Sequence, residues 1–161
     1  MPRRYRPEKR VVEPDLRYDN LHAAMFINRL MRGGKKSTAA RVMYDSMDLI
    51  DERGNTPAIE VFEQALENVM PRVEVKPRRV GDPGGHDGTE HHDQPVDRHR
   101  QTSFAMRWLL AAARSRSGRS MAEKLAGELM DAASGQGAAV KKRDDMHRMA
   151  EANRAFSHFR Y

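Results

Sequence analysis

Apolar side chains recur at the three-and-four residue spacing of an α-helix in one segment of this chain after another, with glycine or proline between segments. The stripes of the first three segments are Ala23, Phe26, Ile27, Leu30 and Met31; Ala40, Met43, Tyr44, Met47 and Ile50; and Ile59, Phe62, Leu66 and Val69. Those of the last three are Phe104, Trp108 and Ala111; Ala122, Leu125, Ala126, Leu129, Ala132 and Ala133; and Met149, Ala152, Phe156 and Phe159. The pattern predicts six helices and a mainly α fold.

Each predicted helix begins at a residue type that caps helices. The candidate caps are Asp19 or Asn20, Ser37, Thr56 before Pro57, Thr102 or Ser103, Ser120 with Glu123 as a capping box, and Asp144 or Asp145. The fourth segment is apolar nearly all round, which is typical of the central helix of a bundle. We therefore expect Trp108 to lie in the core and not on a surface that stacks on bases.

Between the third and fourth predicted helices, apolar residues recur at every second position. Residues 72–76 alternate between apolar and charged side chains, which predicts a half-buried strand, and Pro77 limits that strand to an edge. Residues 82–97 contain five acidic residues and no Lys or Arg, with Val96 as their one sizeable apolar side chain. Because this tract has no face to bury and its acids repel phosphates, we expect no regular second strand and no close RNA contact there.

A chain of 161 residues fits one domain with a core of its own. The absence of cysteine excludes disulfides, thiolate metal sites and a cysteine nucleophile. The longest apolar run, residues 108–113, is far shorter than the roughly 20 residues that span a bilayer, and no signal-peptide pattern is present. We expect a soluble protein of intracellular type.

Arginine dominates the charge of the chain. Of 29 basic residues, 22 are Arg and 7 are Lys, and the formal net charge is +6. Outside the acidic tract 82–97, the remaining 145 residues carry +11. Since arginine grips phosphate with two hydrogen bonds and stacks on bases, this balance predicts a nucleic-acid partner, with membrane headgroups as the lesser alternative.

The basic residues gather at the ends of predicted elements and in an N-terminal arm, residues 1–14. The candidate RNA-binding residues are Arg3, Arg4, Arg6, Arg10, Lys35, Lys36, Lys76, Arg78, Arg79, Arg114, Arg116, Arg119, Lys141, Lys142, Arg143, Arg148 and Arg154. Basic clusters at the ends of rigid elements suit the backbone of a folded RNA. We also expect Arg98 and Arg100 to lie near the RNA beside the acidic tract.

Other functions have less support in the residues. A helical DNA-binding regulator is the alternative, since basic helices joined by a glycine turn also suit a major groove, but no helix concentrates the basic residues. No nucleophile, acid–base or cofactor constellation predicts an enzyme, so no catalytic residue and no cofactor are expected. The metal-like group His86, Glu90, His91, His92, Asp93 and His99 matches no zinc motif, so no metal is expected.

Four blocks of sequence together resemble one family. They are FINRLMRGGKKS at 26–37, ALENVMPRVEV at 65–75 followed by RRVG at 78–81, MAEKLA at 121–126, and GAAVKKRDDMHRMAEANRAF at 137–156. The opening MPRR also fits. Over residues 1–81 and 100–161 the chain resembles the bacterial-type small-subunit ribosomal protein seven family.

The resemblance implies a six-helix bundle with a two-stranded β-ribbon inserted between helices three and four. It implies one RNA-binding domain over 1–161, with the arm at 1–14 and the ribbon region at 72–101. Family members are structural, non-enzymatic constituents that bind the 3′ major domain of small-subunit rRNA and nucleate folding of the head. The implied surroundings are exit-site tRNA, mRNA and neighbouring ribosomal proteins, with the chain a monomer in a cytoplasmic bacterial or an organellar ribosome.

The resemblance fails between residues 82 and 99. The family typically has a second glycine after residues 80–81 and then an alternating strand with a basic turn, whereas this chain has the acidic tract, about five residues longer by alignment. Two origins fit the sharp boundaries: a lineage-specific loop, or an altered reading frame within one window. The returning strand of the ribbon is not readable from these residues.

Overall fold

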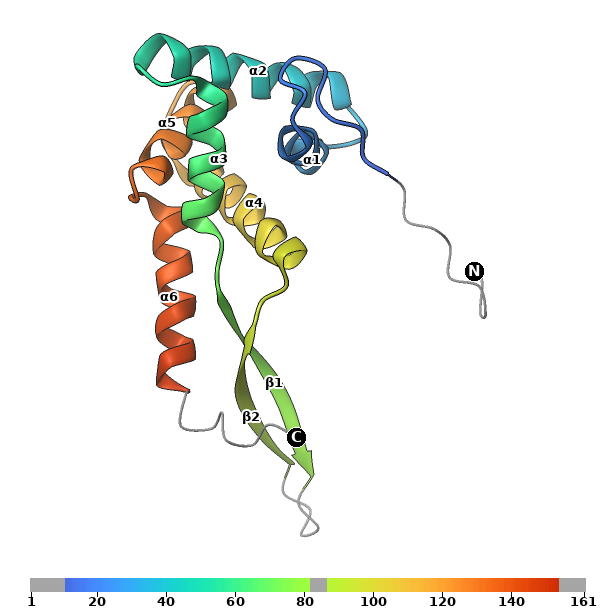
Figure 1. The fold of residues 1–161 in the computed structure, drawn as a ribbon, viewed down its shortest axis with the longest axis vertical. Helices are drawn as coiled ribbons and strands as arrows, with labels where there is room; N and C mark the ends of the chain where they lie inside the picture. The colour runs from blue at the N-terminus through green and yellow to red at the C-terminus, as the bar shows by residue number, and fades with distance from the viewer. Residues whose placement is uncertain (1–10, 82–86, 154–161) are drawn as a thin grey trace.

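The computed structural model describes residues 11–81 and 87–153, which form six helices and two strands. In chain order the elements are α1 (Leu21–Leu30), α2 (Lys36–Arg53), α3 (Ala58–Val69), β1 (Val73–Gly81), β2 (Asp87–Pro95), α4 (Arg98–Ser115), α5 (Met121–Ala133) and α6 (Ala138–Ala152). The helices form one body, from which the ribbon and α6 extend in the same direction (Figure 1). The predicted helical bundle with a β-ribbon between the third and fourth helices is confirmed.

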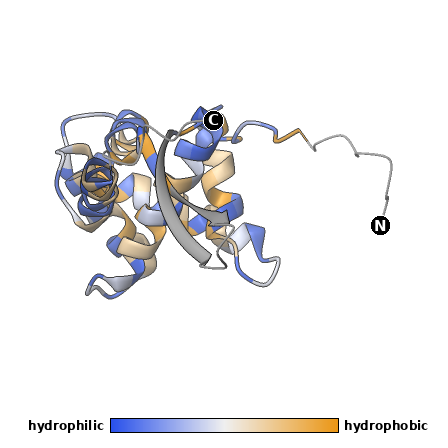
Figure 2. Cartoon of the chain, turned by 90° about the horizontal axis from the view of Figure 1, so that it is seen from below, coloured by the Kyte–Doolittle hydropathy of each residue, from blue (hydrophilic) through white to orange (hydrophobic). Residues whose placement is uncertain are grey.

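The core forms where the predicted stripes of α1, α2, α3 and α5 meet. Phe26 of α1 and Phe62 of α3 are fully buried and meet edge to face, with ring centroids 5.4 Å apart. α5 contacts α2, α3, α4 and α6, and hydrophobic residues line the inner sides of the helices (Figure 2). Burial of each large apolar side chain contributes about 1.5–3 kcal/mol, so these stripes supply the main stabilising term.

The face of α4 that is buried differs from the predicted one. α4 buries Ala105, Met106, Leu109, Leu110 and Ala113, which lie opposite the predicted stripe. Phe104 and Trp108 are only half-buried, with Trp108 packed against the core, and Ala111 is exposed. The prediction that Trp108 is a core residue is confirmed only in part, since its ring packs against the core but is not fully buried. A helix that is apolar nearly all round offers two possible faces, and the face opposite Trp108 is the one enclosed here.

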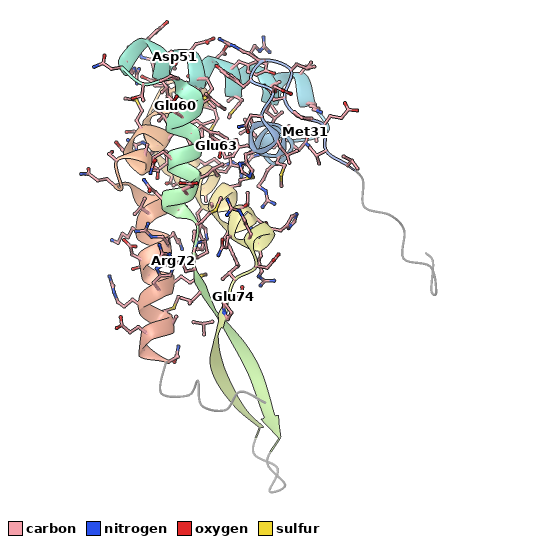
Figure 3. All side chains as sticks on the ribbon, in the orientation of Figure 1. Met31, Asp51, Glu60, Glu63, Arg72 and Glu74 are labelled. Atoms are coloured by element: carbon pink, nitrogen blue, oxygen red, sulfur yellow. The ribbon has the colours of Figure 1, made fainter. Side chains whose placement is uncertain are left out.

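Two of the predicted helix caps are confirmed by hydrogen bonds. Asn20 accepts from the amide of Ala23 at 2.9 Å, and Ser120 accepts from the amide of Glu123 at 3.2 Å. The start of α3 differs, because its first amide, Ala58 N, donates to Asp51 Oδ1 at 2.7 Å and not to Thr56 (Figure 3). A residue at the end of the preceding helix thus provides the cap.

The fourth and sixth helices begin earlier than predicted, at Arg98 and Ala138. α6 starts directly after Gly137, whose φ of +95° suits glycine. The basic run Lys141–Arg143 therefore lies inside α6. The predicted inward positions of α6 are also wrong, since Met149 is 53% exposed and Ala150 is buried instead. Phe156 and Phe159 lie outside the described residues.

The acidic tract forms the second strand of the ribbon, so the prediction of no regular strand there is wrong. β1 and β2 pair antiparallel from Val73 opposite Pro95 to Gly81 opposite Asp87. A ladder is made by backbone groups, and a two-stranded ribbon need not bury a face. The lack of apolar residues therefore argued against burial but not against pairing. The register also places Arg78 opposite Glu90, which opposes charges across the strands.

The base of the ribbon is fixed to the helices by polar contacts (Figure 3). Glu74 is 3% exposed and accepts from Arg100 Nε at 2.7 Å. The amide of Val96 donates to the carbonyl of Arg72 at 3.1 Å, and the amide of Arg72 donates to His147 Nε2 of α6 at 3.0 Å. These bonds join β1 to both α4 and α6.

Replacing Asp51 with alanine tests its role as the cap of α3. The change leaves the first amide of α3 without its acceptor, so we expect the free energy of unfolding to fall by about 0.5–2 kcal/mol. Urea denaturation at pH 7 measures this loss. Glu52→Ala, at the exposed neighbouring position, is the control and should change stability by less than about 0.5 kcal/mol. Equal losses in both variants would contradict the assignment.

The contact between His147 and β1 predicts a pH-dependent stability. Burial, with help from Arg143 and Arg72, lowers the pKa of His147, and the neutral ring accepts the amide of Arg72. As the pH falls through the ordinary histidine value of about 6.5, the unfolded chain binds the proton first, so stability is lost below that pH and present above it. His147→Gln should flatten this part of the stability–pH profile. An unchanged profile in the variant would refute the contact's role.

Candidate nucleic-acid interface

Charge is divided between the helices. α4 contains four Arg and no acidic residue, whereas α3 contains three Glu and no Lys or Arg. α4 contacts α1, and it follows directly on the ribbon, so the basic helix lies between α1 and the ribbon (Figure 1). One side of the bundle therefore includes the most basic helix of the fold.

The turn between α1 and α2 meets the end of α4. Gly33 and Gly34 adopt φ of +58° and +75°, which makes the tight turn, and Lys35 and Lys36 follow it as exposed residues. The adjoining hollow has a volume of about 340 Å³ and is lined by Leu30, Arg32, Lys35, Thr38, Ala39, Val42, Arg114 and Met121. Two predicted clusters, at Lys35 and at Arg114, are thus brought together around an apolar floor.

The predicted cluster after α4 divides into outward and inward arginines. Arg114 and Arg119 are exposed. Arg116 instead pairs with Glu128 at 2.8 Å and Asp131 at 2.6 Å, and these hydrogen bonds raise its pKa. Because Glu128 is fully buried, the charge of Arg116 is used inside the fold. A carboxylate between Leu125 and Leu129 on an apolar stripe was the available sequence signal for this partner.

The basic residues of α6 divide in the same way. Lys141 and Lys142 are exposed, and Arg148 is 78% exposed with Asp145 at 3.5 Å. Arg143 donates to the carbonyl of Asn68 and to Asp144, so it joins α6 to the end of α3. Asn68 in turn donates to the carbonyls of Ala132 and Ala133 at the end of α5.

The remaining predicted residues are placed only in part. Lys76, Arg78 and Arg79 belong to β1, opposite His92, Glu90 and Thr89 of β2. Arg98 is exposed at the start of α4, and Arg100 is engaged by Glu74. The arm residues Arg3, Arg4, Arg6 and Arg10, together with Arg154, lie outside the described residues.

The structure adds basic residues that the sequence patterns did not single out. Arg29 of α1 donates to the carbonyl and to Oγ of Ser103 at 3.2 and 3.0 Å. Burial and the nearby Arg107 lower the pKa of Arg29. Arg107 lies over the ring of Phe104, 5.7 Å from its centroid. Because Arg29 and Arg107 belong to different helices, no sequence pattern brought them together.

A buried carboxylate fixes the chain where the basic arm leaves the bundle. Asp15 is 7% exposed and accepts from the amides of Arg17 and Tyr18 at 3.1 and 3.2 Å. It also accepts from Tyr44 Oη at 2.7 Å, and burial together with this bond raises the pKa of Tyr44 to about 12. The arm therefore starts from a defined point beside α2.

Among the described side chains, no group of three His, Cys, Asp or Glu is placed to hold a metal ion. The helices in the described ranges are all too short or too polar to cross a membrane. What the described surface does offer is a set of outward Lys and Arg side chains on a rigid helical frame. This arrangement defines the class of a basic helical protein that binds nucleic acid.

Comparison with known proteins identifies the family. Residues 2–154 match the family described as Ribosomal protein S7p/S5e. The chain is 50% identical to the small ribosomal subunit protein uS7 of Dehalococcoides mccartyi and of Marinobacter nauticus, and 51% identical to that of Prochlorococcus marinus. Each comparison covers 161 residues, all of both chains. The chain belongs to the ribosomal protein S7p/S5e family, a structural and non-enzymatic family, and nothing supports the DNA-binding alternative.

The two classes of arginine predict opposite mutational results. Arg116→Ala leaves the buried Glu128 without its cation, so we expect a loss of about 3–5 kcal/mol in the free energy of unfolding. Arg114→Ala removes an exposed side chain two positions earlier and should change stability by less than about 0.5 kcal/mol. Urea denaturation of both variants makes the comparison. Similar stabilities for the two variants would contradict an internal role for Arg116.

Proposed function

We propose that the chain binds small-subunit ribosomal RNA through the side of the bundle formed by α4, the α1–α2 turn and the ribbon. As a member of its family, the chain is a structural constituent of the small ribosomal subunit. The observation that carries the proposed surface is the meeting of Lys35 and Arg114 beside an acid-free helix. Lys35, Lys36, Arg114 and Arg119 are exposed and form no ion pair with an acidic residue of the described chain, so their charge is available to phosphates.

The rigidity of the frame favours recognition of folded RNA. Lys35, Lys36, Arg114 and Arg119 project from the ends of helices whose inner faces are buried in one core. Their spacing is set before binding, so little backbone ordering opposes the contacts. Cations spread over several elements match the backbone shape of a folded RNA better than the groove of a duplex.

The finer parts of the proposal rest on the family resemblance. The chain binds the 3′ major domain and nucleates folding of the head, and it lies near exit-site tRNA, mRNA and a neighbouring ribosomal protein. The ribbon and α6 extend from the bundle in the same direction, so both can contact partners beyond the bundle (Figure 1). We propose that residues 1–161 act as a single unit, whose basic arm at 1–14 contacts RNA.

The ribbon has strands of opposite charge type, which suggests how it meets RNA. β1 contains Lys76, Arg78 and Arg79, whereas β2 contains Asp87, Glu90 and Asp93. Phosphates favour the basic strand and are repelled by the acidic one. We therefore propose that the ribbon approaches RNA along β1, with β2 away from the phosphates and Arg98 beside the ribbon's base.

Salt titration of rRNA binding tests the proposed surface. Because phosphate contacts release counterions, the logarithm of affinity should fall with log salt by roughly 0.7–0.9 for each contact. The double variant Lys35→Gln, Lys36→Gln should bind more weakly and lower the slope by one or two contacts. Arg53→Gln, at the far end of α2, is the control and should leave both affinity and slope unchanged.

The measurement is filter binding of the full chain to small-subunit rRNA and to a random DNA duplex of equal length. Tighter binding to the rRNA with a steep slope is the expected result. A flat slope, or equal affinity for the DNA duplex, would refute the proposed function.

A further inference from the structure

The outward face of α4 contains a pair of stacked aromatic rings. Phe104 and Trp108 are half-buried one helical turn apart, with centroids 5.4 Å apart and planes inclined by 28°. One turn beyond Trp108, the same face continues with Ala111, which is exposed and has only a methyl group. At Ala111, α4 therefore has no large side chain that would continue the stack of rings.

Arginines lie beside the Phe104 end of this pair. The guanidinium carbons of Arg100 and Arg107 lie 5.4 and 5.7 Å from the centroid of Phe104. Arg29 of α1 is held at Ser103, which lies one helical turn before Arg107 on α4, so the two arginines meet on the same side of that helix. Burial and the charge of Arg107 lower the pKa of Arg29. Neither Arg29 nor Arg107 has an acidic partner in the part of the chain that the structure describes. Two like charges kept close together in this way favour an anion.

We propose that this face binds one unpaired nucleotide of RNA, whose base stacks on Trp108 and whose phosphate lies between Arg29 and Arg107. The proposal rests on the function proposed above and adds a base-binding site to its phosphate contacts. An unpaired nucleotide brings an aromatic plane and an anion in one ligand, which matches the two features of the surface. A base inside a duplex has no free plane, so the site requires a base outside a helix. Stacking accepts any base, so little sequence preference is expected.

Charge also distinguishes RNA from a protein partner at this site. A protein segment would have to supply both an apolar side chain for the rings and carboxylates for the arginines. Each nucleotide of RNA supplies an aromatic plane for the rings and a phosphate for the arginines. RNA is thus the occupant that the surface fits, and a neighbouring protein becomes an outcome of the test.

Trp108 is the only tryptophan of the chain, so its fluorescence reports on this site alone. The full chain is titrated with small-subunit rRNA, with a single-stranded oligouridylate, and with a duplex RNA of equal length. We expect rRNA and oligouridylate to quench the fluorescence and to protect Trp108 from acrylamide. The duplex should cause neither change.

Variants separate stacking from folding. Trp108→Leu removes the aromatic plane and should weaken oligouridylate binding roughly ten-fold, whereas Trp108→Phe keeps a plane and should stay within about two-fold. The double variant Arg29→Gln, Arg107→Gln should also weaken binding while the tryptophan remains as the probe. Arg41→Gln, an exposed residue of α2, is the matched control. Thermal melting of each variant shows whether the fold is intact.

The outcomes distinguish this inference from the proposed function. Filter binding to rRNA at full strength, with Trp108 fluorescence and acrylamide access unchanged, would overturn the nucleotide site and leave rRNA binding intact. Loss of oligouridylate binding in Trp108→Phe equal to that in Trp108→Leu would also overturn it. Shielding of Trp108 only after other small-subunit proteins are added would assign the face to a protein partner. Failure to bind rRNA at all would overturn both proposals.

Discussion

A single buried carboxylate joins the end of α4 to the start of α6, two helix ends that carry outward cations. Glu128 of α5 is fully buried, accepts from Arg116 Nη1 at 2.8 Å and accepts from the amide of Ala139 at 3.0 Å. It thereby joins the α4–α5 turn to the first turn of α6. A Cβ on Gly137 would lie 3.0 Å from Glu128 Oε1, so the chain enters α6 through a residue without one. The ends of α4 and α6, which carry outward cations, are thus held by one charged contact inside the protein.

The ribbon depends on a contact of the same kind. Glu74 is nearly buried and is engaged by Arg100, while His147 accepts the amide of Arg72 from the side of α6. Arg116 and Arg100 were both expected from the sequence to lie near RNA, but each pairs with a buried glutamate of the protein itself. The type of residue therefore does not separate structural from RNA-facing arginines. The separation comes from the partner: Arg116 and Arg100 meet a buried carboxylate, whereas the exposed Arg114 and Arg119 form no ion pair among the described residues.

Much of the helical architecture could be predicted from periodicity, because the stripes of α1, α2, α3 and α5 each have one apolar face. The caps at Asn20 and Ser120 were also readable, since each bonds within its own helix. The predictions failed where a residue distant in the sequence determines the local structure. Asp51 caps α3 from α2, and packing against α5 and α1 chooses which face of α4 is buried. The strand formed by the acidic tract escaped prediction because backbone pairing, and not burial, makes a two-stranded ribbon. For the candidate surface, the Lys35 and Arg114 clusters were found, whereas Arg29 and Arg107 needed the three-dimensional arrangement.

The division of charge between helices explains how a basic protein folds without strong self-repulsion. α2 contains four acidic residues and α3, α5 and α6 contain three each, and several of them pair with cations of neighbouring segments, as Asp48 does with Arg17 and Glu128 with Arg116. α4 has no acidic residue of its own, only Arg100 of its arginines is paired, with Glu74, among the described residues, and its other face buries Ala105, Leu109 and Ala113 completely. Apolar burial on one face thus offsets the repulsion among the arginines on the other. Neutralisation of those arginines by phosphate removes that repulsion, so RNA binding and folding stability are expected to reinforce each other.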